Sequence, residues 1–409
     1  MKILKYFIMF STLFATTITS AGTLVVNSDQ SGGAAKEGFN SYVDAFRAAH
    51  PEVTVVVQEF EKEAYKTQAR NFLTAEAPDV MTWYAGARMK FFVDQGLFLD
   101  VSDVWADAGL NDALGSSKSS STVDGKQYGV PWSYYQIGVY YRKDIFDNLG
   151  LNVPTNWEEF KLVCAMLKKN DIIPITIGSK APWPTAAWFD YINLRTNGYE
   201  FHMDVTAGKV SWEDPRLDAV FAAWRELIEP GYFLENHPSF SWQEGQAPQI
   251  NGEAAMYLIG NFYVKAFEKA GVGDKMDFFQ FPTIVEGVAN AEDAPTNTMH
   301  IPSGAKNVED AKKFLAFMSN KEAATNWAKL RGVLSTNKYA DKPTNRFSVM
   351  GFEMLSAADN IAQFFDRDSN PDMASAAMMG FQEFMVKPDR EVKIRARLEK
   401  ERERIHGSL

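Results

Sequence analysis

Residues 23–83 alternate short apolar runs with helical patterns, and this alternation constrains the fold more than any other feature of the chain. Within it, Phe39, Tyr42, Val43 and Phe46 recur at i, i+3, i+4 and i+7, the spacing of one helix face. A strand–helix–strand–helix–strand order predicts a doubly wound α/β sheet. Ligands of such sheets bind beyond the carboxyl ends of the strands. The predicted strands are residues 23–26, 53–57 and 79–83, and a second predicted helix covers residues 62–74.

Composition limits the kind of partner that this chain can have. The chain has 409 residues, 46% of them apolar, and a formal net charge of −10. This length predicts about two to three domains. An acidic protein without a basic face is a poor partner for nucleic acid or an anionic membrane, so we expect neither.

The first 21 residues have the features of an export signal. Lys2 and Lys5 precede an apolar middle, and Thr19-Ser20-Ala21 forms a small-residue exit, which predicts cleavage near Ala21 and a periplasmic location. An uncleaved anchor is the alternative. The only cysteine, Cys164, allows no intrachain disulfide, so stability must come from a large core.

Residues 125–160 predict a crossing between two lobes. Pro131 keeps residue 130 out of the α region, and three aromatic residues follow it: Trp132, Tyr134 and Tyr135. An apolar strand is predicted at residues 137–141, and a helix is predicted to open at residues 155–156, with Glu158 and Glu159 in its first turn. A proline-led aromatic run is a poor central strand. It is better suited to line a flat, half-apolar ligand where two lobes meet.

The same segment carries a family resemblance. Residues 128–131, Tyr-Gly-Val-Pro, and 154–160, Pro-Thr-Asn-Trp-Glu-Glu-Phe, resemble the hinge segment of the extracellular solute-binding proteins that feed sugars to bacterial ABC importers, the maltose-binding-protein superfamily. Residues 251–256, Asn-Gly-Glu-Ala-Ala-Met, resemble a second signature of that family, and Gly-Asn-Phe at 260–262 resembles the Gly-x-Trp that follows it.

The resemblance implies the fold and the function. It implies a two-lobed, type II-like α/β fold in which each lobe is a mostly parallel sheet flanked by helices. Two or three hinge crossings would join the lobes, near Trp132 and Pro282. The expected first lobe is residues 22–133 and 284–333, and the second is residues 134–283 and 334–409. The expected function is that of a monomeric receptor that closes over a carbohydrate and delivers it to membrane permease subunits, with no cofactor or metal.

Candidate ligand-binding residues come from predicted strand ends, aromatic clusters and family positions. Several have a structural alternative: helix capping for the first three, surface anchoring for Trp183, and surface charge for Asp366 and Arg367. Trp242 can belong to the core or to the site. The candidates are Ser28, Asp29, Gln30, Trp83, Tyr84, Arg88, Trp132, Tyr134, Tyr135, Trp183, Asn261, Phe262, Asn297, Arg331, Asp366 and Arg367.

Motifs for catalysis are weak in this sequence. The five histidines form no HExxH pair, and the chain contains no G-x-S-x-G elbow or Walker A loop. The many acidic residues are compatible with a catalytic pair of carboxylates like that of a glycosidase. A secreted carbohydrate-active hydrolase is therefore one alternative function. The same fold binding a polyol, a glycerol phosphoester or a polyamine is another; a phosphate ligand would need cations, for which Arg88, Arg331 and Arg367 are the candidates.

Overall fold

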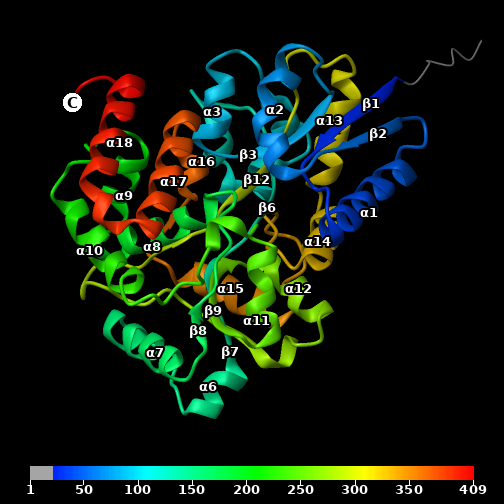
Figure 1. Ribbon diagram of the computed structural model, residues 1–409. Helices are drawn as coiled ribbons and strands as arrows, with labels where there is room; N and C mark the ends of the chain where they lie inside the picture. Colours follow the sequence, from blue (N-terminus) through cyan, green and yellow to red (C-terminus); the bar gives the residue numbers. More distant parts are fainter. Residues whose placement is uncertain (1–21) are drawn as a thin grey trace, which may run out of the picture.

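The computed structural model describes residues 22–409, in which two β-sheets form the centres of two lobes (Figure 1). In the first sheet β1 pairs in parallel with its two neighbours, and β12 is antiparallel to both of its own. Pro131 lies in the edge strand, where a missing N–H is tolerated. The order of strands in this sheet is β2 (Thr54–Glu59), β1 (Thr23–Ser28), β3 (Val80–Tyr84), β12 (Thr296–His300) and β6 (Val130–Tyr134).

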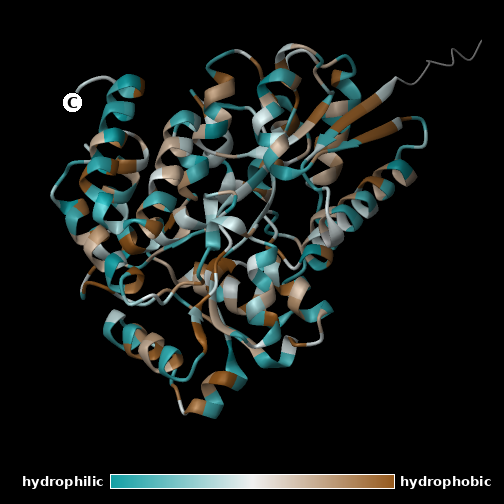
Figure 2. Cartoon of the chain, viewed as in Figure 1, coloured by the Kyte–Doolittle hydropathy of each residue, from teal (hydrophilic) through white to brown (hydrophobic). Residues whose placement is uncertain are grey.

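Helices cover both faces of this first sheet. On one face Leu24 and Val26 pack in the same cluster as Phe39 of α1 (Gly33–Ala49), and α1 lies against α13 (Val308–Met318) and α14 (Lys321–Arg331). On the other face Met81 packs with Tyr65 of α2 (Lys62–Thr74) and with residues of α3 (Ala87–Val93). Strands β1 and β2 are hydrophobic in their middle and polar at their ends, whereas α1 is mixed (Figure 2). The predicted doubly wound lobe is therefore confirmed.

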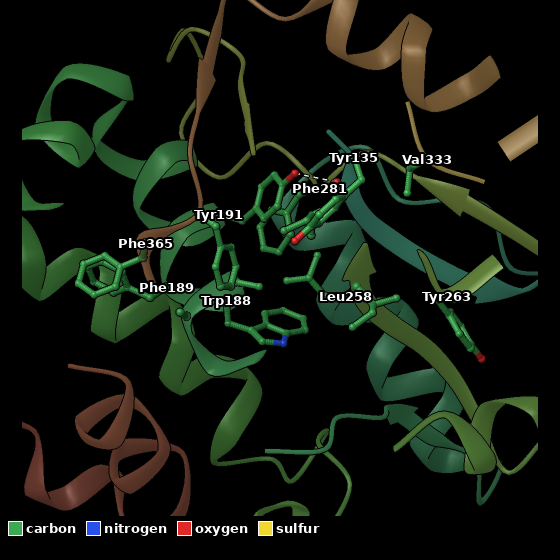
Figure 3. Packing of buried hydrophobic residues seen from close by; sticks show 14 of the residues in the cluster. Tyr135, Trp188, Phe189, Tyr191, Leu258, Tyr263, Phe281, Val333 and Phe365 are labelled. Atoms are coloured by element: carbon green, nitrogen blue, oxygen red, sulfur yellow. Dashed lines mark hydrogen bonds between the residues drawn. The ribbon is translucent and has the colours of Figure 1, made fainter. Parts of the chain in front are cut away.

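The second lobe has a four-stranded sheet of its own. Trp188 and Tyr191 of α8 (Trp183–Asn197) pack with Phe281 in its core (Figure 3). The helix α7 (Trp157–Lys169) begins where the sequence predicts, because Asn156 accepts a hydrogen bond from the backbone N–H of Glu159 at 3.0 Å. The order of strands is β10 (Met276–Phe279), β7 (Ile137–Arg142), β9 (Ala254–Gly260) and β8 (Ile173–Ile175).

The remaining elements mostly surround this second sheet or connect the lobes. The helices α17 and α18 pack against each other, with the carboxyl terminus beyond α18 (Figure 1). Among residues 22–409, no helix is both long and apolar enough to cross a bilayer. These elements are α4 (Ser102–Asp107), α5 (Leu110–Ala113), β4 (Thr122–Val123), β5 (Lys126–Gln127), α6 (Lys143–Leu149), α9 (Tyr199–Thr206), α10 (Arg216–Ile228), α11 (Ala247–Asn251), α12 (Val264–Lys269), β11 (Ala291–Asp293), α15 (Arg346–Ala357), β13 (Asn360–Ala362), α16 (Phe365–Asp368), α17 (Pro371–Val386) and α18 (Glu391–His406).

The chain changes sheets at three places. It leaves β6 at Tyr134 and enters β7 at Ile137, and it returns to the first sheet between β11 and β12. The third crossing follows Leu334, which pairs with Tyr134 across an isolated bridge. The second crossing thus lies beyond Pro282, because β11 still pairs with β13 before the chain turns back.

Two segments rich in polar residues have an ordered, partly buried structure. Residues 115–121, of which six are serine or glycine, form two short 3₁₀ turns, and Ser121 is buried. The terminal helix buries Ile394 and Leu398 against α17 and keeps Arg402 only 1% exposed. This helix therefore has a narrow apolar face, which is difficult to recognise in the sequence because most of its other residues are charged. The predicted export signal, residues 1–21, lies outside the described residues.

Candidate functional site

The loops that follow β1 and β3 meet, as expected for neighbouring parallel strands. The Asp29 carboxylate accepts hydrogen bonds from Thr82 Oγ1 at 3.0 Å and Gln30 Nε2 at 2.7 Å. Lys62 Nζ of α2 lies 3.8 Å from the other carboxylate oxygen. Burial alone would raise the pKa of Asp29, but Lys62 and these hydrogen bonds together lower it below the ordinary value. The first lobe therefore presents an ionised carboxylate at this end of its sheet.

Arg367 connects the second lobe to this end of the first sheet. Its guanidinium lies 4.2 Å from the centre of the Tyr84 ring. It donates hydrogen bonds to Tyr135 Oη at 2.8 Å and to Asn297 Oδ1 at 3.1 Å. Burial would lower the pKa of Arg367, but Tyr135, Tyr84 and Asp366 together raise it above the ordinary value, so the side chain stays a cation.

Asp366, the neighbour of Arg367 on α16, pairs with cations of the first lobe. Lys66 Nζ lies 3.2 Å and Arg88 Nη2 3.8 Å from Asp366 Oδ2. Burial opposes ionisation, yet Lys66, Arg88 and Arg367 together lower the pKa of Asp366 to about 2. A second contact between α16 and the first lobe is the hydrogen bond that the backbone N–H of Ala87 donates to Asp368 Oδ1 at 3.2 Å. These contacts join α16 of the second lobe to α2 and α3 of the first.

Aromatic side chains of the second lobe surround the same place. Phe262 packs edge-on against Tyr135, with ring centres 5.1 Å apart, and its ring lies 6.3 Å from that of Trp183. Trp242, which the sequence leaves undecided, lies 5.2 Å from Phe262 in the same cluster. Trp183 is the first residue of α8, and its buried indole N–H has no hydrogen-bond partner among the described residues.

Two predicted site residues lie in the core instead. Trp83 packs between Tyr65 and Phe92 and donates its indole N–H to the carbonyl of Arg88 at 3.3 Å. Trp132 is 2% exposed, with its ring stacked on Tyr42 and 4.3 Å from the ring of Trp327. Both tryptophans belong to hydrophobic core clusters of the first lobe, so the structure does not bring them into the polar cluster around Arg367.

Three other predicted residues make structural contacts within the fold. Asn261 donates to the carbonyl of Gly332 at 2.8 Å. Ser28 Oγ accepts from the backbone N–H of Gln30 at 3.1 Å, which is turn chemistry. Arg331 packs on Trp327 and against Gly38; burial lowers its pKa to about 10, although Asp29 opposes this.

Tyr134 faces away from Arg367. It lines a cavity of about 550 Å³, between α14 and α15, that also has Leu334 and Phe352 in its wall. A larger groove of about 1340 Å³ lies between α17 and α18. Arg367 lines neither of these two hollows and is buried, with 4% of its surface exposed.

Sequence reasoning missed three polar residues of this cluster: Lys62, Lys66 and Thr82. The lysines lie one helical turn apart on α2, which would place both on one face of a predicted helix. That face becomes important only because α16, about 300 residues later, packs against it. Within residues 22–409, no group of three or more His, Cys, Asp or Glu side chains is placed to hold a metal ion.

Comparison with known proteins gives the family. The model of the bacterial extracellular solute-binding proteins matches residues 31–325. The chain belongs to this family. The solved bacterial solute receptor AcbH, described as having an exclusive preference for β-D-galactopyranose, is 30% identical; the match covers 94% of this chain and 99% of AcbH with a TM-score of 0.89.

More distant relatives agree with this assignment. A Pyrococcus horikoshii ABC transporter extracellular-binding protein is 23% identical over 75% of this solute-binding protein and 70% of its own length. The multiple sugar-binding protein of Streptococcus mutans is 21% identical over 66% of this chain and 68% of its own. A solved chitin oligosaccharide-binding protein shares the fold, with 22% identity, a TM-score of 0.87, and coverage of 94% of this chain and 99% of its own. The family and these relatives are binding proteins, and the expected two-lobed α/β fold is confirmed. The expectation of a mostly parallel sheet is wrong for the second lobe, where β7 is antiparallel to both β10 and β9 and only β8 and β9 pair in parallel.

Proposed function

We propose that this protein captures a neutral carbohydrate between its two lobes and hands it to the permease of an ABC importer. The observation that carries the proposal is the cluster at Arg367, where both lobes supply polar groups beside aromatic rings. Arg367 and Lys62 can donate to ligand hydroxyls, and Asp29 and Asp366 can accept from them. Phe262 and Trp183 offer flat apolar faces to the C–H side of a sugar ring.

The charges of this cluster favour a neutral ligand over a phosphoester. Each ionised carboxylate has a cation nearby: Lys62 beside Asp29, and Lys66 and Arg88 beside Asp366. A phosphate would bring two more negative charges to carboxylates that already use these cations. A sugar hydroxyl both donates and accepts, and so it fits a site with carboxylates and guanidinium groups side by side.

Closure of the lobes explains both capture and release. The contacts of Asp366 and Asp368 with the first lobe exist only in the closed arrangement, and a ligand that bridges the lobes adds to them. We further propose that the protein works as an exported monomer, with residues 1–21 removed, and that the lobes meet at the three crossings described above.

The test is a thermal-shift screen followed by calorimetry. The panel pairs neutral sugars with charged or open-chain counterparts: D-galactose with D-galacturonate, D-glucose with D-sorbitol, and maltose with glycerol 3-phosphate. A ligand present at 100 times its Kd adds about 2.7 kcal/mol to the free energy of unfolding. Neutral sugars should stabilise the protein, and solution scattering should show it becoming more compact with ligand.

Two results would contradict the proposal. If only the charged compounds of the panel stabilised the protein, its ligand would be an anion and not a neutral sugar. Release of shorter products from oligosaccharides would reveal a hydrolase. The product assay uses the same samples, so binding and cleavage are measured together.

A further inference from the structure

Two buried carboxyl groups lie side by side beneath α16. Asp190 is in the middle of α8, and Asp293 ends β11 at the second crossing; both are 0% exposed. Helix α8 packs against β11, and the backbone N–H of Asp293 donates to Oη of Tyr191, the residue after Asp190, at 3.4 Å, which places the two carboxyl groups next to each other. Asp190 Oδ2 also accepts from the backbone N–H of Phe365, the first residue of α16, at 3.0 Å. The pair therefore touches both the segment that carries Arg367 and a crossing between the lobes.

Phe365 fixes α16 from the same side. Its ring packs edge-on against Phe189 of α8, with ring centres 5.6 Å apart (Figure 3). A four-residue helix has few internal hydrogen bonds, so its position depends on such outside contacts. The hydrogen bond from Phe365 to Asp190 is the polar part of that support.

The charged neighbours of the pair are already engaged elsewhere. Arg195 of α8 pairs with Glu292 and donates to two backbone carbonyls, and Tyr191 Oη donates to Glu292 at 2.9 Å. Asp366 of α16 is held by Lys66. His202 of α9 lies 3.7 Å from Asp190 Oδ1, but burial lowers the pKa of this imidazole to about 3 and leaves it neutral.

The Asp190–Asp293 pair needs a bound proton to be stable in this buried place. In the described part of the chain Asp190 Oδ1 and both oxygens of Asp293 have no hydrogen-bond partner among groups that carry a donor hydrogen. Burial, and for each carboxyl the charge of an acidic neighbour, raise the pKa of both groups well above the ordinary value. Two adjacent buried carboxylates cannot both ionise, whereas one proton between them supplies the missing O–H donor.

We propose that Asp190 and Asp293 share one proton at neutral pH and together act as positioning residues that hold α16 in its ligand-binding place. The inference rests on the proposed function, because it assigns Arg367 and Asp366 of α16 to the ligand. When alkaline solution removes the proton, the two carboxylates repel each other. The support under Phe365 is then lost, and ligand affinity falls.

The first test detects the proton directly and needs no ligand. Infrared spectra of the full mature protein at pH 8 should contain the C=O band of a protonated carboxylic acid, since ordinary Asp and Glu are ionised at this pH. Asp293→Asn should remove the band, because an amide N–H then replaces the shared proton. Asp190→Asn should do the same, and it serves where the first variant does not fold. Absence of the band from the wild-type protein would overturn the inference, whether or not a sugar binds.

The second test measures function. The Kd of the tightest neutral sugar from the screen is followed by calorimetry from pH 6 to pH 10. Wild-type affinity should fall by up to about tenfold per pH unit above the pKa of the pair, as linkage to one proton requires. Asp293→Asn should show an affinity that stays nearly constant.

The asparagine variant also separates this effect from that of Lys62. The pKa of Lys62 is lowered by burial, although Asp29 opposes this, so its loss of charge could weaken binding in alkali too. A parallel fall in wild type and in Asp293→Asn would assign the effect to such a group and overturn the inference. Constant affinity in the wild type would overturn it as well. Failure of every sugar to bind would instead reject the proposed function.

Discussion

The guanidinium of Arg367 lies 4.2 Å from the centre of the Tyr84 ring and donates a hydrogen bond to Tyr135. This one side chain, carried by α16 of the second lobe, thereby touches the end of β3 in the first lobe and the first crossing between the lobes. Aromatic rings, together with oxygen acceptors on β12 and at the first crossing, stabilise this cation where the two lobes meet.

Replacing Arg367 with lysine should weaken sugar binding. Lysine keeps the charge but cannot donate to Tyr135 and Asn297 together in the planar geometry of the guanidinium. Each charge-assisted hydrogen bond contributes about 1.5–3 kcal/mol, so we expect at least roughly a tenfold rise in Kd. Calorimetry measures it, with Arg397→Lys as the control, because Arg397 is an exposed residue that pairs with Glu383. An unchanged Kd for Arg367→Lys would remove Arg367 from the site.

The two adjacent tyrosines of the first crossing give a matched comparison. Tyr135→Phe removes the acceptor of the Arg367 hydrogen bond, so Kd should rise about three- to tenfold, as loss of about 1 kcal/mol implies. Tyr134→Phe removes a hydroxyl that faces the cavity beside Leu334, and Kd should not change. Equal effects of both variants on Kd would mean that the crossing, rather than the hydroxyl of Tyr135, controls binding.

Local features of the sequence predicted the helices well. The bounds of α2, α7 and α13 follow from apolar spacing and from capping residues such as Asn156, all of which act within one or two helical turns. The crossing at residues 134–137 was also readable, because Pro131 places β6 at a sheet edge.

The site itself was only partly predictable. Trp83 and Tyr84 are neighbours, yet one faces the core and the other Arg367; the sequence shows two aromatic residues but not which of them meets Arg367. Lys62 and Lys66 look like an ordinary helix surface in the sequence, but in the fold Lys62 lies beside Asp29 and Lys66 pairs with Asp366 of α16. Asp190 and Asp293 are about 100 residues apart, and only the fold makes them a pair.

Asp366 should make the stability of the protein sensitive to acid. Its pKa in the folded state, about 2, lies below the ordinary value of 3.8, so its stabilising effect is present above that ordinary value and is lost as the pH falls through about 2. The shift corresponds to about 2 kcal/mol. Denaturant unfolding of the wild-type protein at successive pH values should show the free energy of unfolding falling between about pH 4 and pH 2, a window set by this shift.

The Asp366→Asn variant isolates this contribution. It should be less stable at neutral pH, because Lys66 and Arg88 lose their carboxylate, and its stability should depend less on pH in the acid range. Asp389→Asn, on the exposed 3₁₀ turn before α18, is the control and should follow the wild-type curve. Identical acid profiles for Asp366→Asn and wild type would refute the assignment.

Trp132 should matter for stability and not for ligand contact. Its ring is stacked between α1 and α14, and its buried indole N–H has no hydrogen-bond partner in residues 22–409. Trp132→Phe therefore loses volume without losing a hydrogen bond, whereas Trp132→Ala leaves a cavity that costs about 3–5 kcal/mol. Denaturant unfolding should rank wild type, Phe and Ala in that order. Kd at 15–20 °C below each midpoint should stay at the wild-type value; a rise in Kd for the folded Phe variant would return Trp132 to the site.

Gly86 offers a way to hold the lobes apart without touching the ligand. A Cβ added there would lie 2.5 Å from Asp368 Oδ1, the oxygen that accepts from Ala87 when α16 docks on α3. Gly86→Ala should force Asp368 to give up that bond and should shift the protein towards an open form, with a higher Kd and less compaction by ligand in solution scattering. Gly86 has a φ of +74°, so the substitution also strains the backbone. Gly96→Ala controls for that strain, because Gly96 has a φ of +68° with nothing within 4 Å of its added Cβ. Both variants should lose stability in denaturant, Gly86→Ala the more because its ψ of −145° lies outside the left-handed helical region. Only Gly86→Ala should lose affinity; equal Kd values would show that the Asp368 contact does not govern closure.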